Sequence, residues 1–175
     1  DAWSDQVLSL HNSNRVDYGA APLTWISSLY PNTQSYAAQC KFEHSSGGAY
    51  GENLAAGTGS FGISNAMTLW MNEADNNPGF SSATGHFTQV VWKTTTQVAC
   101  AIADCPAGTI FGQASKYVVC RYSPPGNVLG QFPCVYFYLL RIYVVINLLH
   151  MQPKRWTTRV KNGTPEMSIC DIFIG

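Results

Sequence analysis

The side chains that could support chemistry are two histidines and two glutamates in unusual local settings. His44 precedes a glycine-rich loop and His86 directly follows a glycine. Glu52 also follows a glycine, and Glu73 lies three residues after Trp70, at the margin of an apolar helical stripe. Imidazole and carboxylate both suit Zn²⁺, and a carboxylate can also hold an imidazole in one tautomer for acid–base work. From spacing alone, a metal site, an acid–base pair and four unrelated surface residues all remain open.

The other two histidines indicate no chemistry. His11 lies four residues before Arg15 on the same helical face, which predicts a structural polar pair. His150 belongs to a C-terminal segment of different character and is set aside. Ser45 is adjacent to His44, but no nucleophile turn surrounds it, and the chain has no HExxH, GxSxG or P-loop motif.

Length and composition exclude several classes of protein. The chain has 175 residues, which suits one domain with room for an appendage. Only 11% of the residues are charged, and ten basic side chains balance ten acidic ones, so clustered basic charge for nucleic acid is not expected. At 46% hydrophobic, the chain is also too apolar to be disordered.

The chain divides into two parts of different character. Residues 1–131 carry five basic and eight acidic side chains, a net charge of −3, whereas residues 132–175 have a net charge of +3. Residues 132–151 are nearly all aromatic or aliphatic, but Arg141 lies in the middle, which disfavours a membrane span. The alternatives are a membrane anchor, a buried extra element, or a non-native peptide from a retained intron or frameshift, which the break in composition favours.

Six cysteines indicate an oxidising compartment. No CxxC or zinc-finger spacing occurs, so disulfides are expected, and the four cysteines before residue 131 allow three pairings. The first residue is Asp1 and not Met, which we interpret as a mature, secreted chain whose signal peptide has been removed.

Periodicity predicts an α+β domain with an antiparallel sheet, because helices come first and strands follow. The first helix is expected to turn Trp3, Val7 and Leu10 toward the core. The expected helices span 3–18, 32–40 and 63–74, with a short helical turn at 52–56, and the expected strands span 86–92, 97–103 and 116–122.

Five strings in fixed order resemble the CAP superfamily of cysteine-rich secretory, antigen 5 and pathogenesis-related 1 proteins, and most of all its fungal pathogenesis-related-1-like branch. The resemblance covers residues 3–131. The strings are His11-Asn12-x-x-Arg15, Pro22-Leu23-x-Trp25, Gly51-Glu52-Asn53-Leu54, Gly85-His86-Phe87-Thr88-Gln89-Val90-Val91-Trp92 and Cys120-x-Tyr122-x-Pro124-x-Gly126-Asn127.

The resemblance implies a secreted three-layer α-β-α sandwich with a central antiparallel sheet. It implies a cavity tetrad of His44, Glu52, Glu73 and His86, in which His44 and His86 can hold zinc or another divalent ion that folding does not require. It also implies the disulfides Cys40–Cys105 and Cys100–Cys120.

The activity that the resemblance implies is binding of sterol or fatty acid without catalysis, as a defence protein or a secreted effector in host–pathogen interaction. The sterol loop would include Asn76, Asn77, Pro78, Gly79 and Phe80, but Phe80 is the one aromatic of the expected pattern and the loop is short, which argues against sterol. A fatty acid would lie between helices 3–18 and 63–74, where plain core packing is the favoured alternative.

Two other functions stay open at this point. One is a zinc-dependent hydrolase, with zinc on His44 and His86 and with Glu52 or Glu73 as the base. The other is a disulfide-stapled scaffold recognised by a host protein. Nucleic acid is not an expected partner, and membrane association is expected only if residues 132–151 form an anchor.

Overall fold

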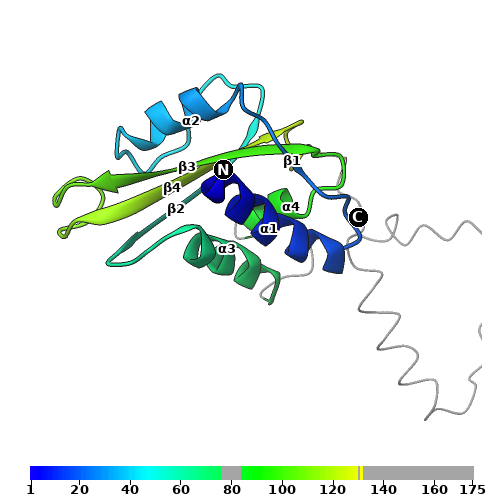
Figure 1. Ribbon diagram of the computed structural model, residues 1–175, viewed down its shortest axis with the longest axis horizontal. Helices are drawn as coiled ribbons and strands as arrows, with labels where there is room; N and C mark the ends of the chain where they lie inside the picture. The colour runs from blue at the N-terminus through cyan, green and yellow to red at the C-terminus, as the bar shows by residue number, and fades with distance from the viewer. Residues whose placement is uncertain (76–83, 130, 132–175) are drawn as a thin grey trace, which may run out of the picture. The chain divides into compact units, whose positions relative to one another are not determined.

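The computed structural model describes residues 1–75, 84–129 and 131 (Figure 1). The chain divides into two units, Asp1–Pro133 and Cys134–Gly175, of which the second lies outside the described residues. The predictions that concern the tail after residue 131 therefore stay predictions. Among the residues that are described, no helix is long and apolar enough to cross a membrane.

A four-stranded sheet forms the middle layer of the domain, in the order β1-β3-β4-β2. Its strands are β1 (Thr24–Trp25), β2 (Gly51–Thr58), β3 (Gln97–Cys105) and β4 (Ser115–Ser123). The β3–β4 and β2–β4 pairs are antiparallel over their whole length, while the two residues of β1 pair with β3 in parallel. The strands expected at 97–103 and 116–122 are confirmed, and β1 is an element that periodicity did not predict.

Helices cover both faces of this sheet (Figure 1). One face carries α2 (Tyr30–Ala37), and the other carries α1 (Ala2–Asp17) and α3 (Ile63–Met71). A 3₁₀ helix (Asn72–Asp75) follows α3, and α4 (Gly85–Val90) comes after the segment 76–83. The expected α-β-α sandwich is therefore the fold of this domain.

The strand predicted at 86–92 is wrong, because most of this segment forms α4. A strand would place Thr88 and Val90 on one face and Phe87 and Gln89 on the other, yet in the helix all four are buried. The helix begins where the carboxylate of Glu73 accepts the backbone N–H groups of His86 and Phe87. That contact spans 13 residues or more of sequence, so local periodicity could not predict it.

The helical turn predicted at 52–56 is also wrong, because these residues lie in β2. Each residue of β2 has a partner in β4, from Gly51 opposite Tyr122 to Thr58 opposite Ser115. Alanine and glycine have little preference for strands, so cross-strand pairing decided the conformation of this segment.

The buried face of α1 differs from the expected apolar stripe. Its buried residues are Ser4, Val7, His11 and Arg15, so three of the four are polar. Arg15 makes this possible because its guanidinium donates to the carbonyls of Ala21, Val90, Trp92 and Thr95. A buried charge is tolerated when its donors are satisfied in this way.

The domain contains two disulfides, with the pairing that the resemblance implies, and the first joins a helical layer to the sheet. Cys40–Cys105 connects the chain just after α2 to the end of β3, and Cys100–Cys120 links neighbouring positions of β3 and β4. The first closes a loop of 65 residues and the second a loop of 20.

Candidate functional site

Glu52 is the acceptor around which the first half of the candidate site is built. It is the second residue of β2, and its side chain is only 6% exposed. Oε1 accepts the Ser45 backbone N–H at 2.9 Å and faces Nδ1 of His44 at 3.1 Å. Oε2 accepts from the Ser45 hydroxyl at 2.7 Å and from Nε of Arg121 at 3.0 Å. Glu52 therefore fixes the start of the glycine-rich loop to the edge of the sheet.

Arg121 provides the positive charge that balances Glu52. The two residues are directly opposite each other in β2 and β4, and the Arg121 side chain is 1% exposed. Its guanidinium lies 4.3 Å from the ring centroid of Tyr50 and 5.0 Å from that of Tyr36, and it also donates to Asn32. Burial alone would raise the pKa of Glu52, but the hydrogen bonds from Ser45, Arg121 and His44 outweigh burial and lower it.

Glu73 organises the second half of the candidate site. It lies on the 3₁₀ helix that follows α3, and its Oε1 is 2.6 Å from Nδ1 of His86. Its Oε2 accepts the backbone N–H groups of His86 and Phe87, both at 3.0 Å. Trp70 stacks on the other side of the imidazole, with ring centroids 6.3 Å apart. The structure thus places the four predicted residues in two His–Glu pairs, His44 with Glu52 and His86 with Glu73.

Both pairs leave the same ring nitrogen for a ligand. An ionised carboxylate only accepts hydrogen bonds, so Nδ1 of His44 and of His86 carries the proton and Nε2 carries the lone pair. This carboxylate–imidazole arrangement is the one that metal-binding histidines use. Nε2 of each histidine can therefore act as a ligand atom for a divalent ion such as zinc.

A group of three close metal-type side chains lies elsewhere in the domain and does not qualify as a metal site. In residues 1–75, 84–129 and 131, the three with ligand atoms within 4.8 Å of one another are His11, Cys100 and Cys120, and no three of the four candidate-site residues lie that close. The two sulfur atoms form a disulfide and are not thiolates.

His11 is a structural residue, as its spacing predicted, but it is buried and hydrogen-bonded to Val7 and Tyr122 instead of forming the expected pair with Arg15. Its Nδ1 donates to the Val7 carbonyl at 2.8 Å, and its Nε2 accepts from the Tyr122 hydroxyl at 2.9 Å. Burial lowers the pKa of His11 to about 4; the hydrogen bond to the Val7 carbonyl opposes this effect, and the nearby charge of Arg15 adds a smaller decrease. The imidazole is therefore neutral at ordinary pH.

A hydrogen-bonded chain extends from His11 to the second half of the site, and the sequence analysis missed it. Asn53 donates through Nδ2 to the Tyr122 hydroxyl at 3.3 Å and to the His86 carbonyl at 2.9 Å. All four residues of this chain belong to the five matched strings. His11, Asn53 and Tyr122 are buried, which the strings alone could not show.

Ser45 is engaged as a structural donor. Its hydroxyl donates to Glu52 and lies 3.1 Å from the hydroxyl of Tyr50. The imidazole of His44 is hydrogen-bonded to Glu52 and not to this hydroxyl. The arrangement therefore lacks the nucleophile–base contact of a serine hydrolase.

The expected sterol loop lies outside the described residues, and the helix faces expected to hold a fatty acid carry buried side chains. The loop residues Asn76, Asn77, Pro78, Gly79 and Phe80 belong to the segment 76–83. Between α1 and α3, the apolar side chains of Val7, Met67 and Trp70 are buried. This burial supports core packing of α1 against α3, the alternative to a fatty-acid site.

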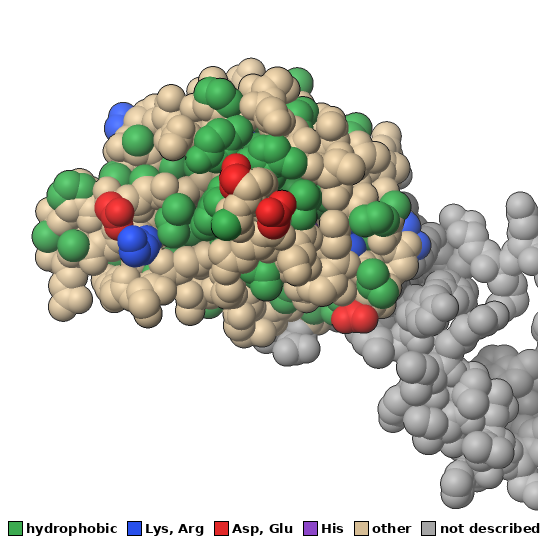
Figure 2. Space-filling view, viewed as in Figure 1, with side chains coloured by type: hydrophobic (Ala, Val, Ile, Leu, Met, Phe, Trp, Pro, Cys, Tyr) green, Lys and Arg blue, Asp and Glu red, His purple; other side chains and the backbone are tan. Residues whose placement is uncertain are grey.

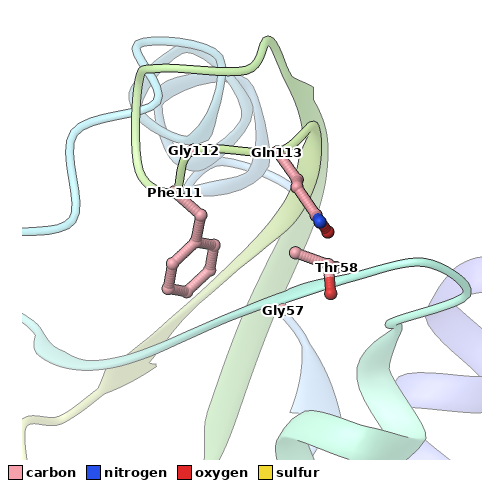
Figure 3. A pocket seen from close by; sticks show the side chains of 5 residues that line it. All are labelled: Gly57, Thr58, Phe111, Gly112 and Gln113. Atoms are coloured by element: carbon pink, nitrogen blue, oxygen red, sulfur yellow. The ribbon is translucent and has the colours of Figure 1, made fainter.

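The face drawn in Figure 2 and one surface depression in the described residues offer no further candidate site. A depression of about 440 Å³ between β2 and the β3–β4 turn is lined by Gly57, Thr58, Phe111, Gly112 and Gln113, with no charged side chain (Figure 3). On the face drawn in Figure 2, charged side chains are few and scattered among apolar ones. That face therefore has no basic patch of the kind that nucleic acids require.

Comparison with known proteins gives one family. A family model for the cysteine-rich secretory protein family matches residues 8–122. Pathogenesis-related protein 1B of Nicotiana tabacum is 41% identical over 138 residues, which cover 72% of this chain and 77% of the relative. Secreted protein RBT4 of Candida albicans is 41% identical over 140 residues, which cover 75% of this chain and 37% of the relative.

The chain thus spans less than half the length of this fungal relative. Among solved structures, that of MpPR-1i superimposes with a TM-score of 0.62 at 22% identity, covering 74% of this chain and 92% of the other, which supports the fold. The motifs, the sandwich and the family match agree, and the chain belongs to the cysteine-rich secretory protein (CAP) family, with pathogenesis-related proteins of fungi and plants as its relatives.

Proposed function

We propose that this chain is an extracellular binding protein of the pathogenesis-related-1 type, in which His44 and His86 hold a divalent metal ion such as zinc. The observation that carries the proposal is that each imidazole has Nδ1 on a carboxylate, which leaves the Nε2 lone pair for a metal. An extracellular location is supported by the two disulfides and by a relative named as a secreted protein.

The state of the two carboxylates favours binding over catalysis. A zinc hydrolase needs a carboxylate that can accept a proton from metal-bound water. Glu52 already accepts four hydrogen bonds, one of them from a guanidinium, and Glu73 accepts three. Neither is set up as a base, so we propose a protein without catalytic activity.

The proposed biological setting is host–pathogen interaction or defence, with a sterol, a fatty acid or a host protein as partner. A loop with Phe80 as its single aromatic argues against sterol, and the burial of Val7, Met67 and Trp70 argues against a fatty acid between α1 and α3. The metal site is therefore the part of the proposal to test first.

The decisive experiment is a calorimetric titration of the full chain with zinc at pH 7. We expect uptake by the wild type, loss of uptake in the double variant H44A/H86A, and no change in the control H150A. Uptake should weaken below about pH 6, because an imidazole must be neutral to bind a metal. Equal uptake by the double variant, or none by the wild type, would refute the metal site.

A parallel assay separates binding from hydrolysis. The zinc-loaded chain is incubated with ester and peptide substrates, and binding of a fluorescent fatty acid and a fluorescent sterol is measured in the same preparation. We expect no turnover, and any lipid binding should persist in H44A/H86A. Turnover that disappears in H44A/H86A would instead establish the zinc hydrolase.

A further inference from the structure

The two carboxylates of the candidate metal site differ in the charge of their neighbours. Glu73 is hydrogen-bonded by the imidazole of His86 and by two backbone N–H groups, none of which carries a full positive charge when the imidazole is neutral. Glu52 is paired with the guanidinium of Arg121 at 3.0 Å. Much of the negative charge of Glu52 is therefore balanced before His44 is considered.

Arg121 is held so that it cannot move away from Glu52. The rings of Tyr36 and Tyr50 lie over the Arg121 guanidinium, and Nη1 of Arg121 donates to Asn32. The Arg121 side chain is also buried. The pairing of β2 with β4 places the two residues opposite each other, so backbone geometry also maintains the ion pair.

The two histidines differ in exposure and in the length of the hydrogen bond to their carboxylates. Nδ1 of His86 lies 2.6 Å from Glu73, and the side chain is 33% exposed. Nδ1 of His44 lies 3.1 Å from Glu52, and the side chain is 62% exposed. The backbone of His86 is tied to Glu73 through its N–H and to Asn53 through its carbonyl. A shorter bond to a less neutralised carboxylate makes Nε2 the better donor, and a fixed ring loses less freedom when it binds.

From these contacts we infer that the two halves of the metal site are unequal: His86 is the primary ligand, His44 is the weaker and exchangeable one, and Arg121 is the positioning residue that makes it so. This inference rests on the proposed metal site. Its consequence is that the ion attaches first to the half formed by Glu73 and His86, while the His44 half completes the site.

Single variants of the full chain test the inequality by calorimetry with zinc alone. H86A should weaken zinc binding at least tenfold more than H44A, and both replacements are matched because each removes one partly or largely exposed imidazole. E73Q should also weaken binding more than H44A does. Uptake by the wild type together with equal losses, or a larger loss in H44A, would overturn the inference while leaving the metal site intact. No uptake by the wild type would overturn both.

A measurement on the metal-free wild type tests the role of the carboxylates without any substitution. Long-range ¹H–¹⁵N spectra report the fraction of each imidazole that carries its proton on Nδ1. We expect a larger Nδ1–H fraction for His86 than for His44 at pH 8. In R121Q, if the variant folds, the fraction for His44 should rise toward that of His86. Equal fractions in the wild type would refute the inequality.

Discussion

Acidification from pH 7 to pH 5 should destabilise the CAP domain through His11. The folded state holds this imidazole neutral, with a pKa of about 4 against an ordinary value of 6.5. Below pH 6.5 the unfolded chain binds a proton that the folded chain does not bind, so stability falls as the pH falls. The loss is about 2 kcal/mol at pH 5 and reaches about 3 kcal/mol below pH 4, at 1.36 kcal/mol for each pKa unit.

Urea unfolding at several pH values between 7 and 5 measures this slope. The variant H11Q removes the titrating group, so its stability should depend less on pH by about 2 kcal/mol over this range, whatever its absolute stability. H150Q, which replaces a histidine outside the five matched strings, is the control for replacing one histidine. The reasoning is refuted if H11Q and the wild type lose the same free energy between pH 7 and pH 5.

Three further predictions use the same unfolding assay. Replacing Cys40 and Cys105 with serine opens a 65-residue loop and should lower the free energy of unfolding by about 4 kcal/mol. The same change at Cys100 and Cys120 opens a 20-residue loop and should lower it by about 3 kcal/mol; the reverse order would contradict the chain-entropy model. G51A should cost about 1–3 kcal/mol, because a Cβ there would meet Oε1 of the buried Gln89 at 1.9 Å, whereas G112A has open space and should be neutral. Because the pKa of Glu52 is lowered in the folded state, the stability it contributes above pH 4.5 should be lost as the pH falls below that value. E52Q should reduce the loss of stability below pH 4.5, and E43Q is the control for replacing an exposed glutamate.

Several features of the domain could be predicted from the sequence because their signals are local or carried by fixed strings. The apolar periodicity of 63–74 indicated α3, and the patterns at 97–103 and 116–122 indicated β3 and β4. The five strings indicated the family, the two disulfide pairs and the four polar residues of the candidate site.

Tertiary structure decided the features that depend on partners far away in the sequence. The segment 86–92 is too short for its alternation to separate strand from helix, and Glu73 fixed it as a helix through two backbone N–H groups. The segment 52–56 became a strand because β4 pairs with it along its length.

The candidate site follows the same division between local and distant contacts. The residue types of His44, Glu52, Glu73 and His86 were available from the sequence, but which carboxylate holds which imidazole was not. Arg121 forms an ion pair with Glu52 and not with Glu73. That difference depends on the pairing of β2 with β4, so the sequence did not reveal it. Sequence thus determined which groups the protein has for chemistry, and long-range pairing decided their tautomers, charges and exposure, because each of these depends on the atoms that the fold brings into contact.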